Sequence, residues 1–141
     1  MSKEYNGLKF KTELEAIWAA FFDLAGWQWW YNPAPVENWS PDFKVTFPCE
    51  HSECTGSHTL LVSVVPTKDL KSLRKHPSLL YCYGVLNRGG VYLADGGALF
   101  GMGPSVTQWR IIHGSGGGAE SVNSRVSNAM DLWSKAVAYA R

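Results

Sequence analysis

The segment from Thr59 to Val65 constrains the fold of this chain more than any other. Its sequence is TLLVSVV, a nearly continuous apolar run. A strand of this kind is usually buried on both faces of its sheet. The sheet that contains it needs a covering layer on each side, so the segment predicts a mixed α/β sandwich in which helices flank one central sheet.

Helices are marked near both ends of the chain. Between residues 12 and 25 the apolar residues recur at spacings of three and four, which places them on one helical face. Thr12 and Glu15 have the spacing of a capping box, in which the hydroxyl and the carboxylate each bind a backbone N–H, and Gly26 marks the end. Residues 120–140 repeat the helical spacing and predict a closing helix.

Further segments are predicted as strands of the central sheet. Residues 27–31 are rich in strand-forming aromatic residues, and the prolines that follow place them at a sheet edge. Residues 41–47 alternate, so that Asp42 points away from the main apolar face. Residues 79–86 are another apolar run, and residues 107–114 predict a last strand.

The connecting segments carry weaker signals. TKDLKSLRKHP, residues 67–77, predicts a short basic helix or helical turn that Pro77 closes. GSGGG, residues 114–118, predicts a flexible loop, because it lacks the Lys-Ser/Thr ending of a phosphate-binding loop.

Composition limits the class of protein. At 141 residues, with 45% hydrophobic and 18% charged, the chain is expected to form a single domain over residues 1–141. It contains no run long enough for a membrane span and no signal-peptide core, which predicts a cytoplasmic protein with no membrane partner. The net charge of +1 means that a polyanion site must come from local Lys and Arg clusters. Seven tryptophans favour a core of large rings over a set of base-stacking platforms.

A Cys/His cluster lies between two predicted strands, in residues 48–58. Cys49, His51, Cys54 and His58 supply two thiolates and two imidazoles, a common ligand set for tetrahedral zinc. Four protein ligands would close the site, so the zinc would be structural. The alternative is an ordinary hairpin loop that carries polar and thiol residues.

The order of motifs resembles that of the PD-(D/E)xK nuclease superfamily. ELEAIWAAFFDLAGWQWWYNP is followed by SPDF and then by LLVSVVP, and the resemblance is to small single-domain members from phage and mobile elements. It covers residues 1–66 and continues more weakly to AMDLWSKAVAYA. It implies a restriction-endonuclease-like mixed central sheet flanked by helices. Glu15 matches the helix glutamate of the family, and Asp42, preceded by Pro41, matches the motif aspartate.

The second half of the family motif is degenerate. It should place an acidic residue and a lysine in the apolar strand, where this chain has Ser63 and Val65. Mg²⁺ requires hard oxygen ligands, and the lysine assists the attacking water, so neither residue replaces what is missing. Activity would then need migrated residues: Glu50 or Glu53 as the acid, and Lys44, Lys68 or Lys71 as the amine. Glu15 has the alternative role of a helix cap, and Asp42 that of a solvated residue at the strand start.

These features lead to three hypotheses for function. The first is a DNA-associated protein of a phage or mobile element, built on the nuclease fold with an eroded catalytic centre and therefore a pseudoenzyme. The second is an interaction module that inhibits or adapts a host protein. The third is an active endonuclease that uses Mg²⁺ and migrated residues. DNA would contact a set of basic residues that could equally be an ordinary solvated surface: Lys44, Lys68, Lys71, Arg74 and Lys75.

Overall fold

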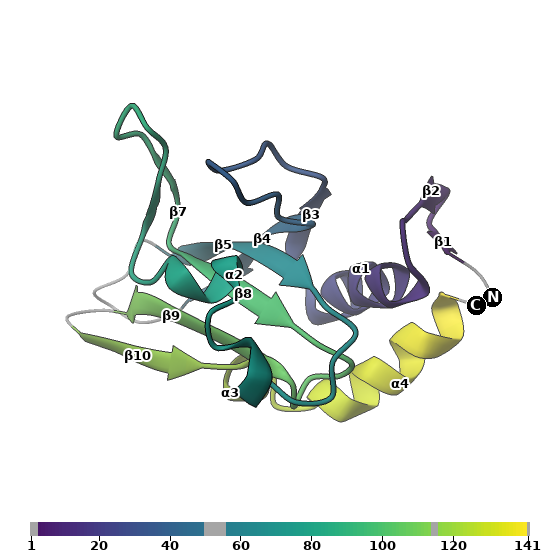
Figure 1. The fold of residues 1–141 in the computed structure, drawn as a ribbon. Coiled ribbons are helices and arrows are strands. Elements are labelled where there is room, and N and C mark those ends of the chain that lie inside the picture. The colour runs from purple at the N-terminus through teal and green to yellow at the C-terminus, as the bar shows by residue number, and fades with distance from the viewer. Residues whose placement is uncertain (1–2, 50–55, 114–115, 141) are drawn as a thin grey trace.

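The protein is a mixed six-stranded sheet flanked by helices (Figure 1), seen in a computed structural model that describes residues 3–49, 56–113 and 116–140. In the order β10-β9-β8-β5-β4-β3, neighbouring strands are antiparallel, except that β5 and β8 are parallel. The strands are β3 (Gln28–Tyr31), β4 (Phe43–Pro48), β5 (Ser57–Val64), β8 (Gly96–Phe100), β9 (Thr107–His113) and β10 (Gly116–Glu120). The predicted α/β architecture is therefore present, with the apolar strand β5 inside the sheet.

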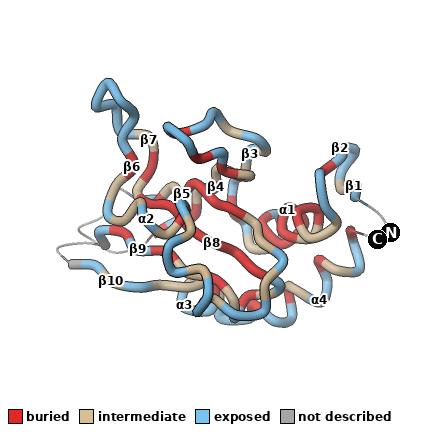
Figure 2. The backbone as a smooth tube through the Cα atoms, in the orientation of Figure 1, coloured by how far each residue is buried: buried red, intermediate tan, exposed pale blue. Residues whose placement is uncertain are grey.

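One face of the sheet, here called the helical face, packs against α1 (Glu13–Ala25) and α4 (Ala129–Tyr139), which lie side by side (Figure 1). Large rings fill the space between these layers, and among them Trp18, Phe22, Phe100 and Trp109 are completely buried. Figure 2 shows α1 and β8 buried along most of their length. Of the seven tryptophans, all of which lie in the described part of the chain, only Trp30 is exposed. The tryptophans thus serve mainly as core residues, as predicted.

Local signals at both ends of α1 set its length. The Thr12 hydroxyl accepts the Glu15 N–H at 3.1 Å, and Gly26 ends the helix with a φ of 77°, a left-handed conformation that glycine adopts readily. The capping-box prediction is only half correct, because the Glu15 carboxylate accepts the N–H of Lys11, at 3.0 Å, instead of that of Thr12. Glu15 is thereby turned toward the residue that precedes the cap.

The second face is covered by the long connection from β5 to β8, together with residues around Trp39. The connection contains a 3₁₀ turn, η1 (Lys71–Leu73), then α2 (Pro77–Leu80) and a hairpin of β6 (Val85–Leu86) and β7 (Tyr92–Ala94). A separate and smaller apolar cluster seals this face: Val36, Trp39, Leu61, Val85 and Ala94.

The prediction of a central strand over residues 79–86 is wrong. Pro77 begins a helix rather than closing one, and the His76 ring caps it by accepting the Ser78 N–H at 3.2 Å. The strand beside β5 is instead β8, in which Gly97 lets α2 approach: a Cβ on Gly97 would lie 2.3 Å from the Ser78 carbonyl oxygen. The apolar run covers the sheet and does not join it.

Other differences lie toward the ends. Residues 116–120 form β10, an edge strand on β9, although residues 116–118 belong to the predicted glycine loop, whose first two residues lie outside the described chain. The predicted closing helix is split into α3 (Val122–Arg125) and α4, with Val126 in extended conformation between them. The predicted lead-in holds a short hairpin, β1 (Glu4–Tyr5) and β2 (Leu8–Lys9). In the described part of the chain no helix is long and apolar enough to cross a membrane.

Candidate functional site

Glu15 and Asp42 converge where α1 begins, β3 ends and β4 begins. Their carboxylates meet at the ammonium group of Lys11, whose Nζ lies 2.8 Å from Asp42 Oδ1 and 3.7 Å from Glu15 Oε2. The Tyr31 hydroxyl donates to Glu15 Oε1 at 2.7 Å. Asp42 Oδ2 accepts the backbone N–H of Val64 at 2.8 Å, which ties the aspartate to β5. Each carboxylate therefore has defined hydrogen-bond donors.

The environment of this pair resists ionisation of Glu15. Burial is the main cause that raises the pKa of Glu15 above that of an ordinary glutamate, and the Asp42 charge adds to it; the Tyr31 hydrogen bond and the Lys11 charge act in the opposite direction. The hydrogen bond to Asp42 raises the pKa of Lys11, and burial with the bond to Glu15 raises the pKa of Tyr31 to about 12. Lys11 is thus firmly charged and serves as the internal counter-ion of two carboxylates.

Ser63 lies across from Asp42, one step beyond the paired residues Phe43 and Val62 of β4 and β5. An acidic residue at position 63 would therefore stand beside Asp42. The Ser63 hydroxyl instead accepts the indole N–H of Trp39 at 2.7 Å, and both residues are buried. The position at which the resemblance predicts an acidic ligand is consequently engaged by an indole.

Val65 follows the end of β5. Its N–H binds the carbonyl of Phe100 at 2.9 Å, so it continues the contact between β5 and β8. The valine side chain offers no donor or acceptor, and the amine of this corner comes from Lys11.

His76 reaches the corner from the connection that covers the second face. Its Nδ1 accepts the Ser78 N–H, so the neutral ring carries its proton on Nε2. Burial lowers the pKa of His76, and the Asp42 charge opposes that shift only in part. The corner therefore combines a lysine and two carboxylates, and the His76 imidazole lies near enough for the Asp42 charge to act on it.

The predicted basic residues are spread over the second face and its cover. Arg74 lines a cavity of about 400 Å³ together with Leu79, Gln108 and Arg110. Lys44 lies over the Trp30 ring, 5.1 Å from its centroid. Lys68, Lys71 and Lys75 are exposed on the same connection as Arg74. The structure thus brings Arg74 together with Arg110, which was not predicted, and separates both from Lys44.

Two of the four proposed zinc ligands can be placed. Cys49 and His58 are both buried where the β4–β5 hairpin leaves the sheet, and His58 Nδ1 lies 3.5 Å from Asp95 Oδ2. His51 and Cys54, like Glu50 and Glu53, lie outside the described residues. Within residues 3–49, 56–113 and 116–140, no three His, Cys, Asp or Glu side chains form a group that could hold a metal.

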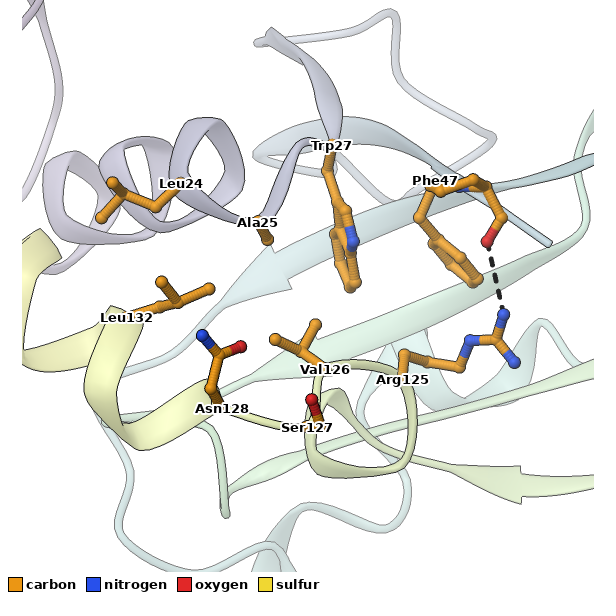
Figure 3. Close-up of a pocket in the computed structure, with 10 residues that line it drawn as sticks. Leu24, Ala25, Trp27, Phe47, Arg125, Val126, Ser127, Asn128 and Leu132 are labelled. Carbon is orange, nitrogen blue, oxygen red and sulfur yellow. Dashed lines mark hydrogen bonds between the residues drawn. The ribbon is translucent and has the colours of Figure 1, made fainter. Parts of the chain in front are cut away.

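A further cavity, of about 290 Å³, lies on the helical face at the junction of α3 and α4 (Figure 3). Arg125 forms one wall: it donates to the Pro48 carbonyl oxygen at 3.3 Å and lies over the Phe47 ring, 5.2 Å from its centroid. Leu24 and Leu132 lie at the other end. Arg125 therefore links the segment between α3 and α4 to the end of β4.

Sequence reasoning missed four residues of the second face and its corner. Lys11 had a readable signal, because it precedes Glu15 by four residues, the spacing of a helical ion pair. Tyr31, Trp39 and Arg110 had none, because tertiary packing brings them to the site. Comparison with protein-family models, curated proteins and solved structures finds no match to the chain.

Proposed function

We propose that this protein is a catalytically inactive relative of the PD-(D/E)xK nucleases, of phage or mobile-element type, that binds DNA without cutting it. The observation that carries the proposal is the Lys11 ammonium between Asp42 and Glu15. A divalent cation would have to displace that ammonium, which is held by a 2.8 Å hydrogen bond to Asp42.

The chain order of the corner supports the family assignment. A helix with Glu15 is followed by a strand headed by Asp42 and then by a strand with Ser63, and the three residues lie at one corner of a mixed sheet. This is the order that the sequence resemblance implies for a metal-dependent nuclease. A restriction-endonuclease-like fold is the proposal that accounts for both observations.

The residues present do not fit a catalytic magnesium ion. Mg²⁺ needs several hard oxygen ligands in near-octahedral array. Here the third protein ligand is replaced by the Ser63 hydroxyl, which is neutral and engaged by Trp39. Asp42 already serves Lys11 and the Val64 N–H, so no reaction step is assigned to a metal at this corner.

Arg74 and Arg110 are the best-placed groups for a DNA phosphate. They come from different elements, line the same cavity and lie among the exposed lysines of the β5–β8 connection. Guanidinium groups that converge on one cavity can bind phosphate oxygens through paired hydrogen bonds. DNA would then lie over the second face of the sheet, away from α1 and α4.

DNA binding is tested by fluorescence anisotropy with labelled duplex at several salt concentrations. The combined change Arg74→Gln and Arg110→Gln should weaken binding and flatten its dependence on salt, because each lost phosphate contact lowers the slope by about one. The matched control is Lys9→Gln with Lys135→Gln, which removes the same charge from exposed positions on β2 and α4. An equal loss in both double variants would leave only a general charge effect and refute the assigned surface.

Inactivity is tested by nicking of supercoiled plasmid with Mg²⁺ or Mn²⁺. The unmodified protein should not cut, whereas Ser63→Glu with Val65→Lys is expected to improve metal binding. Nicking by the unmodified protein that disappears in both Asp42→Ala and Lys11→Met would favour the active endonuclease, with Lys11 as the migrated amine. The proposal of an inactive protein would then be wrong.

One observation favours the interaction module as a second candidate. The β6–β7 hairpin projects from the sheet (Figure 1) and carries exposed apolar side chains, among them Leu86, Val91 and Tyr92. Such residues could contact a host protein. Two results together would favour the interaction module. The protein would show no salt-dependent DNA binding, and it would bind one defined host protein whose binding is lost in Tyr92→Ser.

We also propose that the 48–58 loop binds one structural zinc ion through Cys49, His51, Cys54 and His58. The support is the position of Asp95, because a carboxylate at Nδ1 orients an imidazole that binds metal through Nε2. Elemental analysis should find about one zinc per chain, and Cys49→Ser should lose it. Less than a tenth of an atom per chain after purification without chelator would refute zinc binding.

A further inference from the structure

A groove opens on the second face between two projections of the chain. One wall is the segment that follows β3, with Pro33, Ala34 and Pro35, and the other is the β6–β7 hairpin, with Asn87 and Leu93 (Figure 1). Lys44 and Leu61 form the floor, and the volume is about 310 Å³. The lining combines walls that are apolar except for Asn87 with one cation, Lys44, at the base.

Trp30 stands beside this groove as the exposed tryptophan of the chain. It pairs with Lys44 across β3 and β4, and its side chain is 48% exposed although β3 belongs to the sheet. The other tryptophans contribute to the cores, so burial explains their presence and does not explain that of Trp30. Lys44 Nζ lies over the Trp30 ring, 5.1 Å from its centroid. An exposed ring with such a lysine is an arrangement that single-stranded nucleic acid can use for one stacked base and its phosphate.

The strand register connects the groove with the arginine cavity. Lys44 pairs with Leu61, Leu61 with Gly97, and Arg110 lies across from Gly97, one step beyond Ala98 and Trp109. With strands about 4.8 Å apart, Lys44 and Arg110 are about 14 Å from each other on one face of the sheet. Leu61 and Gly97 between them are covered by Trp39 and α2, so a phosphate backbone that passes over this cover would meet a cation on each side of it.

The groove selects a single strand over a duplex on grounds of size. A volume of about 310 Å³ between two projections accommodates one or two nucleobases and excludes the stacked pairs of a double helix. Asn87 Oδ1 accepts the Val91 N–H at 3.0 Å, which leaves Nδ2 as the group that the amide can offer to acceptors on a base. A peptide would satisfy the apolar residues of the walls but would give no role to Lys44 and Arg110.

We infer that the groove binds single-stranded nucleic acid, with one base on Trp30, its phosphate at Lys44, and the strand continuing toward Arg110. This inference rests on the proposed DNA binding and names the form of nucleic acid that is bound. Since Trp30 is exposed, its replacement should leave the fold intact.

The test compares a fluorescent oligothymidylate with a duplex of equal length by anisotropy. The single strand should bind more tightly, and Trp30→Ala should weaken it about ten- to a hundredfold, the loss expected for one stacked base, while Trp30→Phe recovers part of the affinity. Tyr139→Ala removes another exposed aromatic ring, from α4 on the helical face, and should change nothing.

The outcomes separate this inference from the proposed function. Tighter binding of duplex, or single-strand binding that Trp30→Ala leaves unchanged, would overturn the inference while DNA binding stands. Failure of both nucleic acids to bind would overturn both. Circular dichroism of Trp30→Ala establishes that any loss comes from the groove and not from unfolding.

Discussion

Replacing Lys11 by methionine asks whether charge holds the carboxylate pair together. Methionine keeps much of the aliphatic chain and removes the ammonium, which leaves the Glu15 and Asp42 side chains, 4% and 13% exposed, without their shared cation. The Lys11 side chain is 60% exposed, so solvent screens much of the attraction. We expect the free energy of unfolding at neutral pH to fall by about 1–2 kcal/mol, less than the roughly 3–5 kcal/mol of a fully buried pair.

The loss should depend on pH in a defined direction. Burial and the Asp42 charge raise the pKa of Glu15, so Glu15 takes up a proton early as the pH falls, and protonation removes the repulsion that Lys11→Met creates. Urea unfolding followed by tryptophan fluorescence should show Lys11→Met approaching the wild type near about pH 4 and diverging from it toward about pH 8.

A matched control and a second measurement complete this test. Lys135→Met removes an exposed lysine that lies 3.4 Å from Asp131, and should cost at most about 0.5 kcal/mol. Mn²⁺ should raise the unfolding midpoint of Lys11→Met and leave the wild type unchanged, because only the variant leaves Asp42 Oδ1 and Glu15 Oε2 without the ammonium and open to a cation. A loss that is independent of pH and of Mn²⁺ would show that Lys11 acts by packing, and would refute the counter-ion role.

Three further substitutions have expected outcomes. Glu15→Gln should gain stability relative to the wild type as the pH rises above the ordinary glutamate range, because the raised pKa of Glu15 stabilises the wild-type fold only while the carboxyl is protonated. Chemical unfolding at several pH values measures the difference in unfolding free energy, and a difference that moves in favour of the wild type with rising pH would contradict the raised pKa. Gly97→Ala should destabilise the fold by about 1–3 kcal/mol in thermal unfolding, since the new methyl meets the Ser78 carbonyl at 2.3 Å, and an unchanged melting temperature would contradict that contact. Arg125→Met should lower the free energy of unfolding by about 1 kcal/mol, because it loses the hydrogen bond to the Pro48 carbonyl and the contact with the Phe47 ring. An unchanged free energy of unfolding would mean that these contacts do not stabilise the break between α3 and α4.

Elements with local signals could be predicted from the sequence. Thr12 and Gly26 define α1 by hydrogen bonds and backbone conformation within a few residues, and alternation or continuous apolarity marks β4 and β5. Residues 79–86 were misassigned because an apolar run has the same composition whether it joins a sheet or covers one. Residues 77–80 pack as a helix over β8, where Gly97 has no side chain and leaves room for the Ser78 carbonyl. This packing depends on the sequence of another strand and not on residues 79–86.

The candidate site was predictable only in part, for a similar reason. Glu15 and Asp42 carry the resemblance, and the structure brings them together. Lys11 has the spacing of a partner of Glu15, but its contact with Asp42 depends on how α1 sits on the sheet. Arg110 reaches the second face through strand register, which a single sequence leaves open. Trp39 reaches it by packing of the connection between β3 and β4, which carries no local signal. The zinc ligation remains a prediction, since half of its ligands lie outside the described residues.

The two apolar clusters differ greatly in size, so the second face of the sheet buries less apolar surface than the helical face and is held less strongly. The cluster beneath α1 and α4 includes most of the large rings, whereas the cluster under the β5–β8 connection is built on Val36, Trp39, Leu61, Val85 and Ala94. Amide protons in α2, β6 and β7 should therefore exchange with solvent through partial opening, at a lower free energy than those of β4 and β5. Such an opening would uncover the cluster around Trp39 while the helical face stays folded, and would expose the buried contact between Trp39 and Ser63 to water before the protein as a whole unfolds.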